Sequence, residues 1–245
     1  MFNYNNFVNE NRELSRNMYN NFIKWITLGN YESIVQNIEH YGKIVVNYIP
    51  DRTCVRPLTW AVKNGKNDIV KLLVESGAKI NAKGIDDETS LHVAVNKNNI
   101  EIVRYLLNNG ADINSKEILG WTPLMNSISN QFDDITYFLV NAGADINSTS
   151  KSNETPLMAA ALCDNDNLVN KLLELNADIS VVTSPPNERT ALSYTCKGIW
   201  KTVDVQELII TRQPWNIKFF DDRIGFLPEL KVKYKDAFYI SDLGI

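Results

Sequence analysis

The chain has 245 residues, of which 44% are hydrophobic and 22% are charged, an ordinary composition for a globular protein of one large or two small domains. The formal net charge is −4, and residues 51–182 carry 12 Lys/Arg against 17 Asp/Glu, which argues against a basic stripe for nucleic-acid phosphates. No apolar run is long enough to span a bilayer. From the charge balance we therefore expect no nucleic acid as partner, and from the lack of such a run no membrane.

Two features of the sequence favour a cytoplasmic location. The N-terminus has no basic region followed by an apolar stretch, so no secretory signal is visible. The three cysteines, Cys54, Cys163 and Cys196, lie far apart without a CxxC pair. This pattern favours reduced thiols over a disulfide framework.

Residues 1–50 are predicted to form an N-terminal segment. Residues 1–20 favour an additional helix or a frayed tail. Residues 23–47 fit a degenerate capping repeat, because Ile23 precedes Arg56, where the first regular helix begins, by the same interval that separates the later repeats. This segment lacks the turn and cap residues of the repeats that follow.

A regular interval governs the next part of the chain. ESGAKIN ends at Asn81, NNGADIN at Asn114 and NAGADIN at Asn147, so the phrase returns after a constant interval of about 33 residues. The helix starts RPLTWAV, TSLHVAV, TPLMNSI and TPLMAAA keep the same spacing, and a fifth start, TALSYTC, follows after a slightly longer interval. A period of this length indicates a stack of similar supersecondary structures.

Each repeat is predicted to contain two helices and a turn. Thr89, Thr122 and Thr155 are placed to cap the first helix, and Pro123 and Pro156 follow at its first position. The second helix has apolar residues at helical spacing, as in IVKLLV and IVRYLL. It is predicted to end at a glycine in the left-handed conformation, namely Gly77, Gly110 or Gly143.

Together these features resemble the ankyrin repeat, whose hallmark is a T-P-L-H-x-A helix start. The resemblance covers residues 51–210 and implies an all-α solenoid of about five helix–turn–helix repeats, joined by β-hairpin-like loops and closed by helical terminal caps. His92 keeps the hallmark histidine, for which the resemblance implies hydrogen bonds to neighbouring backbone. Residues 211–245, which are rich in aromatic side chains, are expected to form a C-terminal cap or tail.

The sequence offers no pattern typical of catalysis, a metal site or a cofactor. His40 and His92 are the only histidines, and no H-x-x-x-H, C-x-x-C, EF-hand or Walker spacing occurs. We therefore expect a protein that is not an enzyme, with no cofactor and with neither catalytic nor metal-binding residues.

The resemblance implies binding through the loop tips and the concave face of the first helices. Ile118, Leu119 and Trp121 are apolar at a tip expected to be exposed, and Trp is enriched in interface hot spots. The alternative is that Trp121 packs locally onto Ile118 or the adjacent hairpin. The expected partner-binding residues are Ile85, Asp86, Glu88, Lys97, Ile118, Leu119, Trp121, Asn130, Lys151 and Glu154.

We predict a monomeric interaction protein that binds a protein partner. One version is an effector or antagonist from a virus or an intracellular bacterium, acting in the host-cell cytosol. Two alternatives stay open at this point. The first is an immunity-type inhibitor that covers a basic toxin, and the second is a substrate-recognition adaptor or enzyme whose function lies in residues 211–245.

Overall fold

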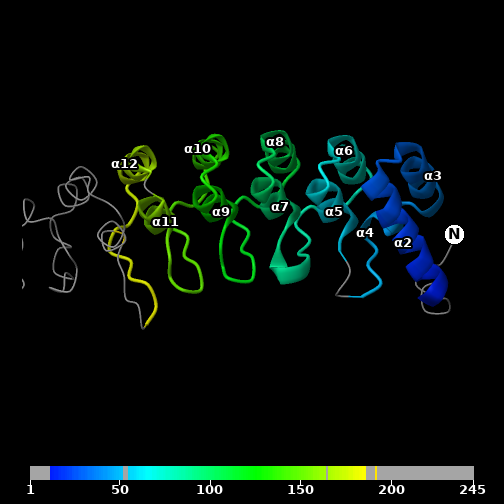
Figure 1. Ribbon diagram of the computed structural model, residues 1–245, viewed down its shortest axis with the longest axis horizontal. Helices are drawn as coiled ribbons and strands as arrows, with labels where there is room; N and C mark the ends of the chain where they lie inside the picture. The colour runs from blue at the N-terminus through cyan, green and yellow to red at the C-terminus, as the bar shows by residue number, and fades with distance from the viewer. Residues whose placement is uncertain (1–11, 52–54, 164, 186–190, 192–245) are drawn as a thin grey trace, which may run out of the picture. The chain divides into compact units, whose positions relative to one another are not determined.

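The computed structural model describes residues 12–51, 55–163, 165–185 and 191 (Figure 1). These residues form helices and loops and contain no strand. The chain divides into two compact parts, an N-terminal unit (Met1–Ile118) and a C-terminal unit (Leu119–Ile245). Two expectations fall outside the described residues: the C-terminal cap or tail at 211–245 and the fifth helix start, which begins at Thr190.

The start of the N-terminal unit differs from the predicted arrangement. α2 (Arg12–Leu28) is one continuous helix that runs from the expected additional segment into the expected capping repeat. α3 (Tyr31–Tyr41) follows, and α4 (Lys43–Asn47) is helical where later repeats have a turn. Phe22 and Ile26 of α2 are 0% exposed because α2 packs against α3 and α5. The polar sequence of this segment therefore conceals an apolar helix face that covers the first regular repeat.

Two regular helix pairs complete the N-terminal unit. The first pair is α5 (Pro57–Lys63) with α6 (Asn67–Glu75), and the second is α7 (Ser90–Asn96) with α8 (Ile100–Asn108). α5 packs against α7 and α6 against α8, so first helices lie in one layer and second helices in another (Figure 1). The loop between the pairs holds a short 3-10 helix, Ile85–Asp87.

The C-terminal unit repeats this arrangement. Its described helices are α9 (Pro123–Ser129), α10 (Asp133–Asn141), α11 (Pro156–Leu162) and α12 (Asp166–Glu174). α9 packs against α10 and α11, and α11 packs against α12. The loops of this unit project on the side of the first helices, away from α10 and α12 (Figure 1).

The repeat period of the sequence is also a period of burial. Leucines of the second helices are 0% exposed at four equivalent positions, Leu73, Leu106, Leu139 and Leu172. Small residues of the first helices are also 0% exposed, at Ala61, Ala94, Ser127 and Ala160. Burying a leucine side chain stabilises a fold by roughly 1.5–3 kcal/mol, and a small residue opposite lets the helices approach closely. The apolar pattern therefore determines which side of each helix faces its neighbours.

The predicted helix ends are confirmed. Thr122 Oγ1 accepts a hydrogen bond from Met125 N at 3.3 Å, and Thr155 Oγ1 accepts one from Met158 N at 3.2 Å. In the helix start at Thr89, Thr89 N donates to His92 Nδ1 at 3.3 Å, as the resemblance implied for this histidine. The glycines that end the second helices have φ of +87° to +88° at Gly77, Gly110 and Gly143.

One repeat carries a buried polar pair in place of two apolar residues. Ser127 stands where the other three described helix pairs have alanine, and Thr136 stands where they have valine. Thr136 Oγ1 donates to Ser127 Oγ at 2.9 Å, and Ser127 Oγ donates to Leu124 O at 2.8 Å. Each hydroxyl therefore has an acceptor for its proton, Thr136 in the Ser127 hydroxyl and Ser127 in the Leu124 carbonyl, which removes most of the penalty for burying them.

Asparagine side chains join successive repeats within each unit. Asn81 Nδ2 donates to Gly110 O at 3.0 Å, and its Oδ1 accepts from Asp112 N at 2.8 Å. Asn47 makes the same two bonds to Gly77 and Lys79, and in the C-terminal unit Asn147 Oδ1 accepts from Asp178 N at 2.8 Å. These amides satisfy backbone groups of the following turn, which the helices cannot pair.

The loops that carry the tips are held by backbone hydrogen bonds between consecutive loops. In the N-terminal unit Ile118 N donates to Asp86 O at 2.8 Å. In the C-terminal unit Lys151 N donates to Leu119 O at 2.8 Å, and Ser184 N donates to Ser152 O at 2.9 Å. The expected hairpin-like loops thus pair through isolated bonds, without a regular strand in the described part of the chain.

Asn81→Ala is expected to lower the free energy of unfolding by about 1–2 kcal/mol, because two backbone groups of the next turn lose their partner. Chemical denaturation with urea measures this loss. Asn109→Ala is the matched control, since Asn109 Nδ2 donates to Tyr105 O of the preceding helix α8 at 2.8 Å and, among the described residues, to no group of the next repeat. Equal losses in the two variants would contradict a special role for Asn81.

Gly120→Ala is expected to be more destabilising than Gly143→Ala, by about 1–3 kcal/mol. Both glycines have positive φ, +81° and +87°, so both variants carry the same backbone strain. A Cβ at Gly120 would lie 2.8 Å from Lys151 N, whereas no described residue beyond its chain neighbours lies within 4 Å of a Cβ at Gly143. Urea denaturation of both variants tests this, and equal losses would show that the loop yields at no cost.

Candidate functional site

The ten expected partner-binding residues all lie at the surface. Ile85, Asp86, Lys97, Ile118, Leu119, Asn130 and Lys151 are exposed, and Glu88, Trp121 and Glu154 are partly buried. Five belong to the N-terminal unit and five to the C-terminal unit, in which Leu119 is the first residue. Leu119 is 62% exposed and Ile118 is 45% exposed, so neither is covered within its own unit. Their role in binding stays a prediction.

A hollow of about 160 Å³ lies beside α5 and α7 in the N-terminal unit. Trp60 and Lys63 of α5 form one side, Val93 of α7 another, and the loop residues Ile85 and Glu88 the rim. The Lys63 Nζ atom lies 5.8 Å from the centroid of the Trp60 ring, within the range of a cation–π contact. The lining of this hollow thus combines an aromatic side chain with charged residues of both signs.

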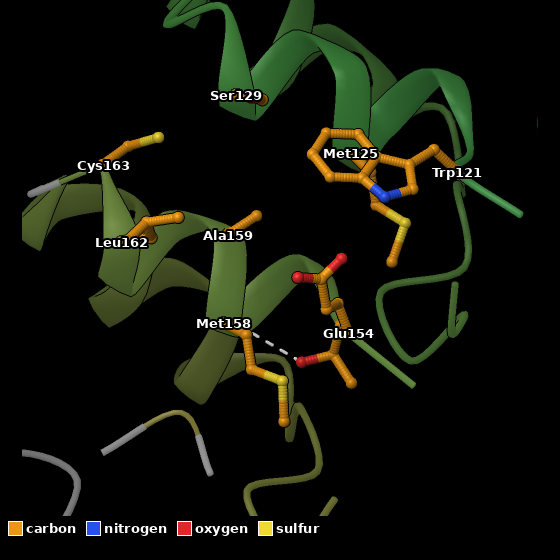
Figure 2. A pocket seen from close by; sticks show the side chains of 9 residues that line it. Trp121, Met125, Ser129, Glu154, Met158, Ala159, Leu162 and Cys163 are labelled. Carbon is orange, nitrogen blue, oxygen red and sulfur yellow. Dashed lines mark hydrogen bonds between the residues drawn. The ribbon is translucent and has the colours of Figure 1, made fainter. Parts of the chain in front are cut away.

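A second, smaller hollow of about 30 Å³ lies between α9 and α11 in the C-terminal unit (Figure 2). Trp121 and Met125 line one side, and Met158, Ala159 and Leu162 line the other. Glu154 enters from the loop, and its carboxylate points toward Trp121 (Figure 2). Leu162 is 58% exposed, so the apolar surface continues beyond the hollow.

The two hollows occupy equivalent positions of the repeat. Five lining residues of the first hollow recur in the second, two repeat periods further along the chain. The pairs are Val55 with Trp121, Thr59 with Met125, Lys63 with Ser129, Glu88 with Glu154, and Val93 with Ala159. The repeat therefore builds the same depression twice, and the residues at these positions give each one a different chemistry.

Each hollow has a glutamate at the equivalent position, Glu88 in one and Glu154 in the other, and the two have different surroundings. In the N-terminal unit burial raises the pKa of the Glu88 carboxyl, Asp86 and Glu117 raise it further, and Lys63 lowers it. Asn96 Nδ2 also donates to Glu88 Oε1 at 3.3 Å. In the C-terminal unit Ser129 replaces the lysine, and Ser150 Oγ is 3.4 Å from Glu154 Oε2. Glu154 thus faces the hollow without the cation that accompanies Glu88.

The described residues contain no group of three or more His, Cys, Asp or Glu side chains placed to hold a metal ion. Burial raises the pKa of the Cys163 thiol at the end of the second hollow, so this thiol stays protonated at neutral pH. None of the described helices combines the length and apolar character needed to cross a membrane.

Sequence reasoning missed part of the C-terminal hollow. Met125 and Met158 stand at the position that the histidine occupies in the T-P-L-H-x-A helix start. Both are almost fully buried, yet they line the hollow, as do the exposed Leu162 and the partly buried Cys163. Methionine at two successive histidine positions was a signal in the sequence, but it did not reveal which side of the helix the thioethers line.

Comparison with known proteins supports the resemblance. A family model described as ankyrin repeats (3 copies) matches residues 28–117 and 91–183. These matches together extend over residues 28–183, well over half of the 245 residues. A comparison with curated proteins gave no match. With the all-helical repeats described above, the matches show that the chain belongs to the ankyrin-repeat family.

Proposed function

We propose that this protein is a non-enzymatic interaction module that binds a protein partner on the face formed by its first helices and loop tips. Ankyrin repeats are in general protein–protein interaction modules. The observation that supports a site on this face is the hollow that recurs at equivalent positions of the repeats, next to exposed apolar side chains.

Exposed apolar side chains lie at both hollows. Ile85 is 48% exposed beside the first hollow, and Leu162 is 58% exposed beside the second. Covering such side chains favours association by roughly 25 cal/mol for each Å² of apolar surface removed from water. Trp60 and Trp121 add large, rigid side chains of the type that dominates the energy of protein interfaces.

The finer proposals concern how binding is used. We propose that the protein acts as a monomer in the cytoplasm by occupying its partner, as an effector or antagonist does, including one delivered to the cytosol of a host cell. The inhibitor of a basic toxin is the variant of this proposal that the acidic C-terminal unit favours. The adaptor alternative depends on residues 211–245, which lie outside the described part of the chain.

The experiment that tests the binding face uses two exposed leucines of the C-terminal unit. Leu162→Ser is expected to weaken the binding of peptides that are selected against the full chain by about tenfold, because it removes apolar surface beside the hollow. Leu175→Ser is the matched control, since Leu175 is 42% exposed at the end of α12 and does not line the hollow. Peptides are selected from a random phage-displayed library against the full chain, and fluorescence anisotropy gives their affinities.

Circular dichroism and thermal melting first establish that both leucine variants fold like the unmodified chain. Loss of affinity in Leu162→Ser alone supports the proposed face. If Leu162→Ser binds every selected peptide as tightly as the unmodified chain does, the hollow of the C-terminal unit is not the binding site and the proposal is wrong for this unit.

A further inference from the structure

Two stretches of the sequence, one in each unit, differ sharply in charge. Residues 12–118 carry 14 Lys/Arg and 12 Asp/Glu, a balance of +2, whereas residues 119–185 carry 2 Lys/Arg and 8 Asp/Glu, a balance of −6. The two lysines of the second stretch are Lys151 and Lys171, and Lys171 lies 4.0 Å from Glu174. The net field of this part of the chain therefore attracts cations and accelerates the approach of a basic partner.

The C-terminal hollow contains one of these acidic residues, Glu154. Among the described residues that line the hollow, Glu154 is the one charged side chain, and the others are apolar or carry a hydroxyl or thiol. Its carboxylate points toward Trp121, from the loop side of the hollow (Figure 2). Among the described residues, Glu154 forms no ion pair. A partly buried carboxylate beside apolar surface gains most from a cation that arrives with a ligand.

The equivalent hollow of the N-terminal unit contains a lysine for which the C-terminal hollow has a serine. There Lys63 stands near Glu88 and supplies a positive charge from the chain itself. Ser129 stands at that position in the C-terminal unit and carries no charge. The exchange of lysine for serine leaves the position of the cation to be filled from outside.

We propose that the C-terminal hollow binds a segment of a partner protein in which an apolar side chain, such as Leu, Met or an aromatic residue, stands next to a Lys or Arg. The apolar side chain packs between Trp121, Met158 and Leu162, and the cation pairs with Glu154. Flexible thioethers at Met125 and Met158 let the shallow hollow adapt to the inserted side chain. This inference rests on the proposed function, because it names the chemistry of the partner at the same face.

The test compares peptides that differ only in charge. Apolar–basic peptides from the phage selection are synthesised together with versions in which each Lys or Arg is replaced by glutamine. The basic peptides are expected to bind the unmodified full chain about tenfold more tightly than their glutamine versions, with the difference shrinking as salt is added. Fluorescence anisotropy measures both affinities at low and at physiological salt.

Three variants then locate the preference. Glu154→Gln removes the carboxylate, and Ser129→Lys restores the lysine of the N-terminal hollow, so both are expected to abolish the tenfold preference. Asn141→Lys is the matched control for Ser129→Lys. It adds the same charge to the same unit, at an exposed position at the end of α10 that does not line the hollow. This control is expected to keep the preference.

The outcomes separate the inference from the proposed function. If binding depends on Leu162 but the glutamine peptides bind as well as the basic ones, the chemistry proposed here is wrong and the binding face stands. That chemistry is equally wrong if the preference survives in both Glu154→Gln and Ser129→Lys. If no peptide depends on Leu162, the proposed function fails for this unit, and the inference fails with it.

Discussion

The fold of this protein depends on the burial of apolar side chains that no single helix pair can cover. Leu73, Leu106, Leu139 and Leu172 are 0% exposed because a second layer of side chains closes over each of them. A pair of short helices has too little apolar surface to be stable alone, so each repeat relies on contacts with others in its unit. At the N-terminal end, α2 supplies this cover with Phe22 and Ile26.

The same periodicity that builds the core also repeats the surface. Because equivalent residues take equivalent places, a depression beside α5 and α7 returns beside α9 and α11, with a glutamate at its rim in both. The buried positions tolerate little change, since packing limits their size. The lining positions are less constrained, and they hold Lys63 in one hollow and Ser129 in the other. Binding chemistry can thus vary while the fold stays constant.

The loops contribute both to the stability of the fold and to the binding surface. Their backbone bonds to neighbouring loops, such as Lys151 N to Leu119 O at 2.8 Å, fix the tips relative to the helices within a unit. A tip held in this way loses little conformational freedom when a partner binds, which favours affinity. Gly120 permits the close approach of the two loops, since a Cβ there would lie 2.8 Å from Lys151 N. Exposed side chains at the tips are therefore presented by a rigid frame.

The sequence by itself determined the repeat, the helix caps, the terminal glycines and the all-α fold, because each follows from local backbone chemistry or from the regular repeat period. Only the tertiary structure decided that α2 is continuous, that Asn81 bonds to the following repeat, and that Met125 and Met158 line a hollow with Glu154. The contacts of Asn81 and of the hollow join residues of different repeats, and their geometry depends on how the helices pack. Local pattern assigns a residue to a helix, but packing decides what surrounds its side chain.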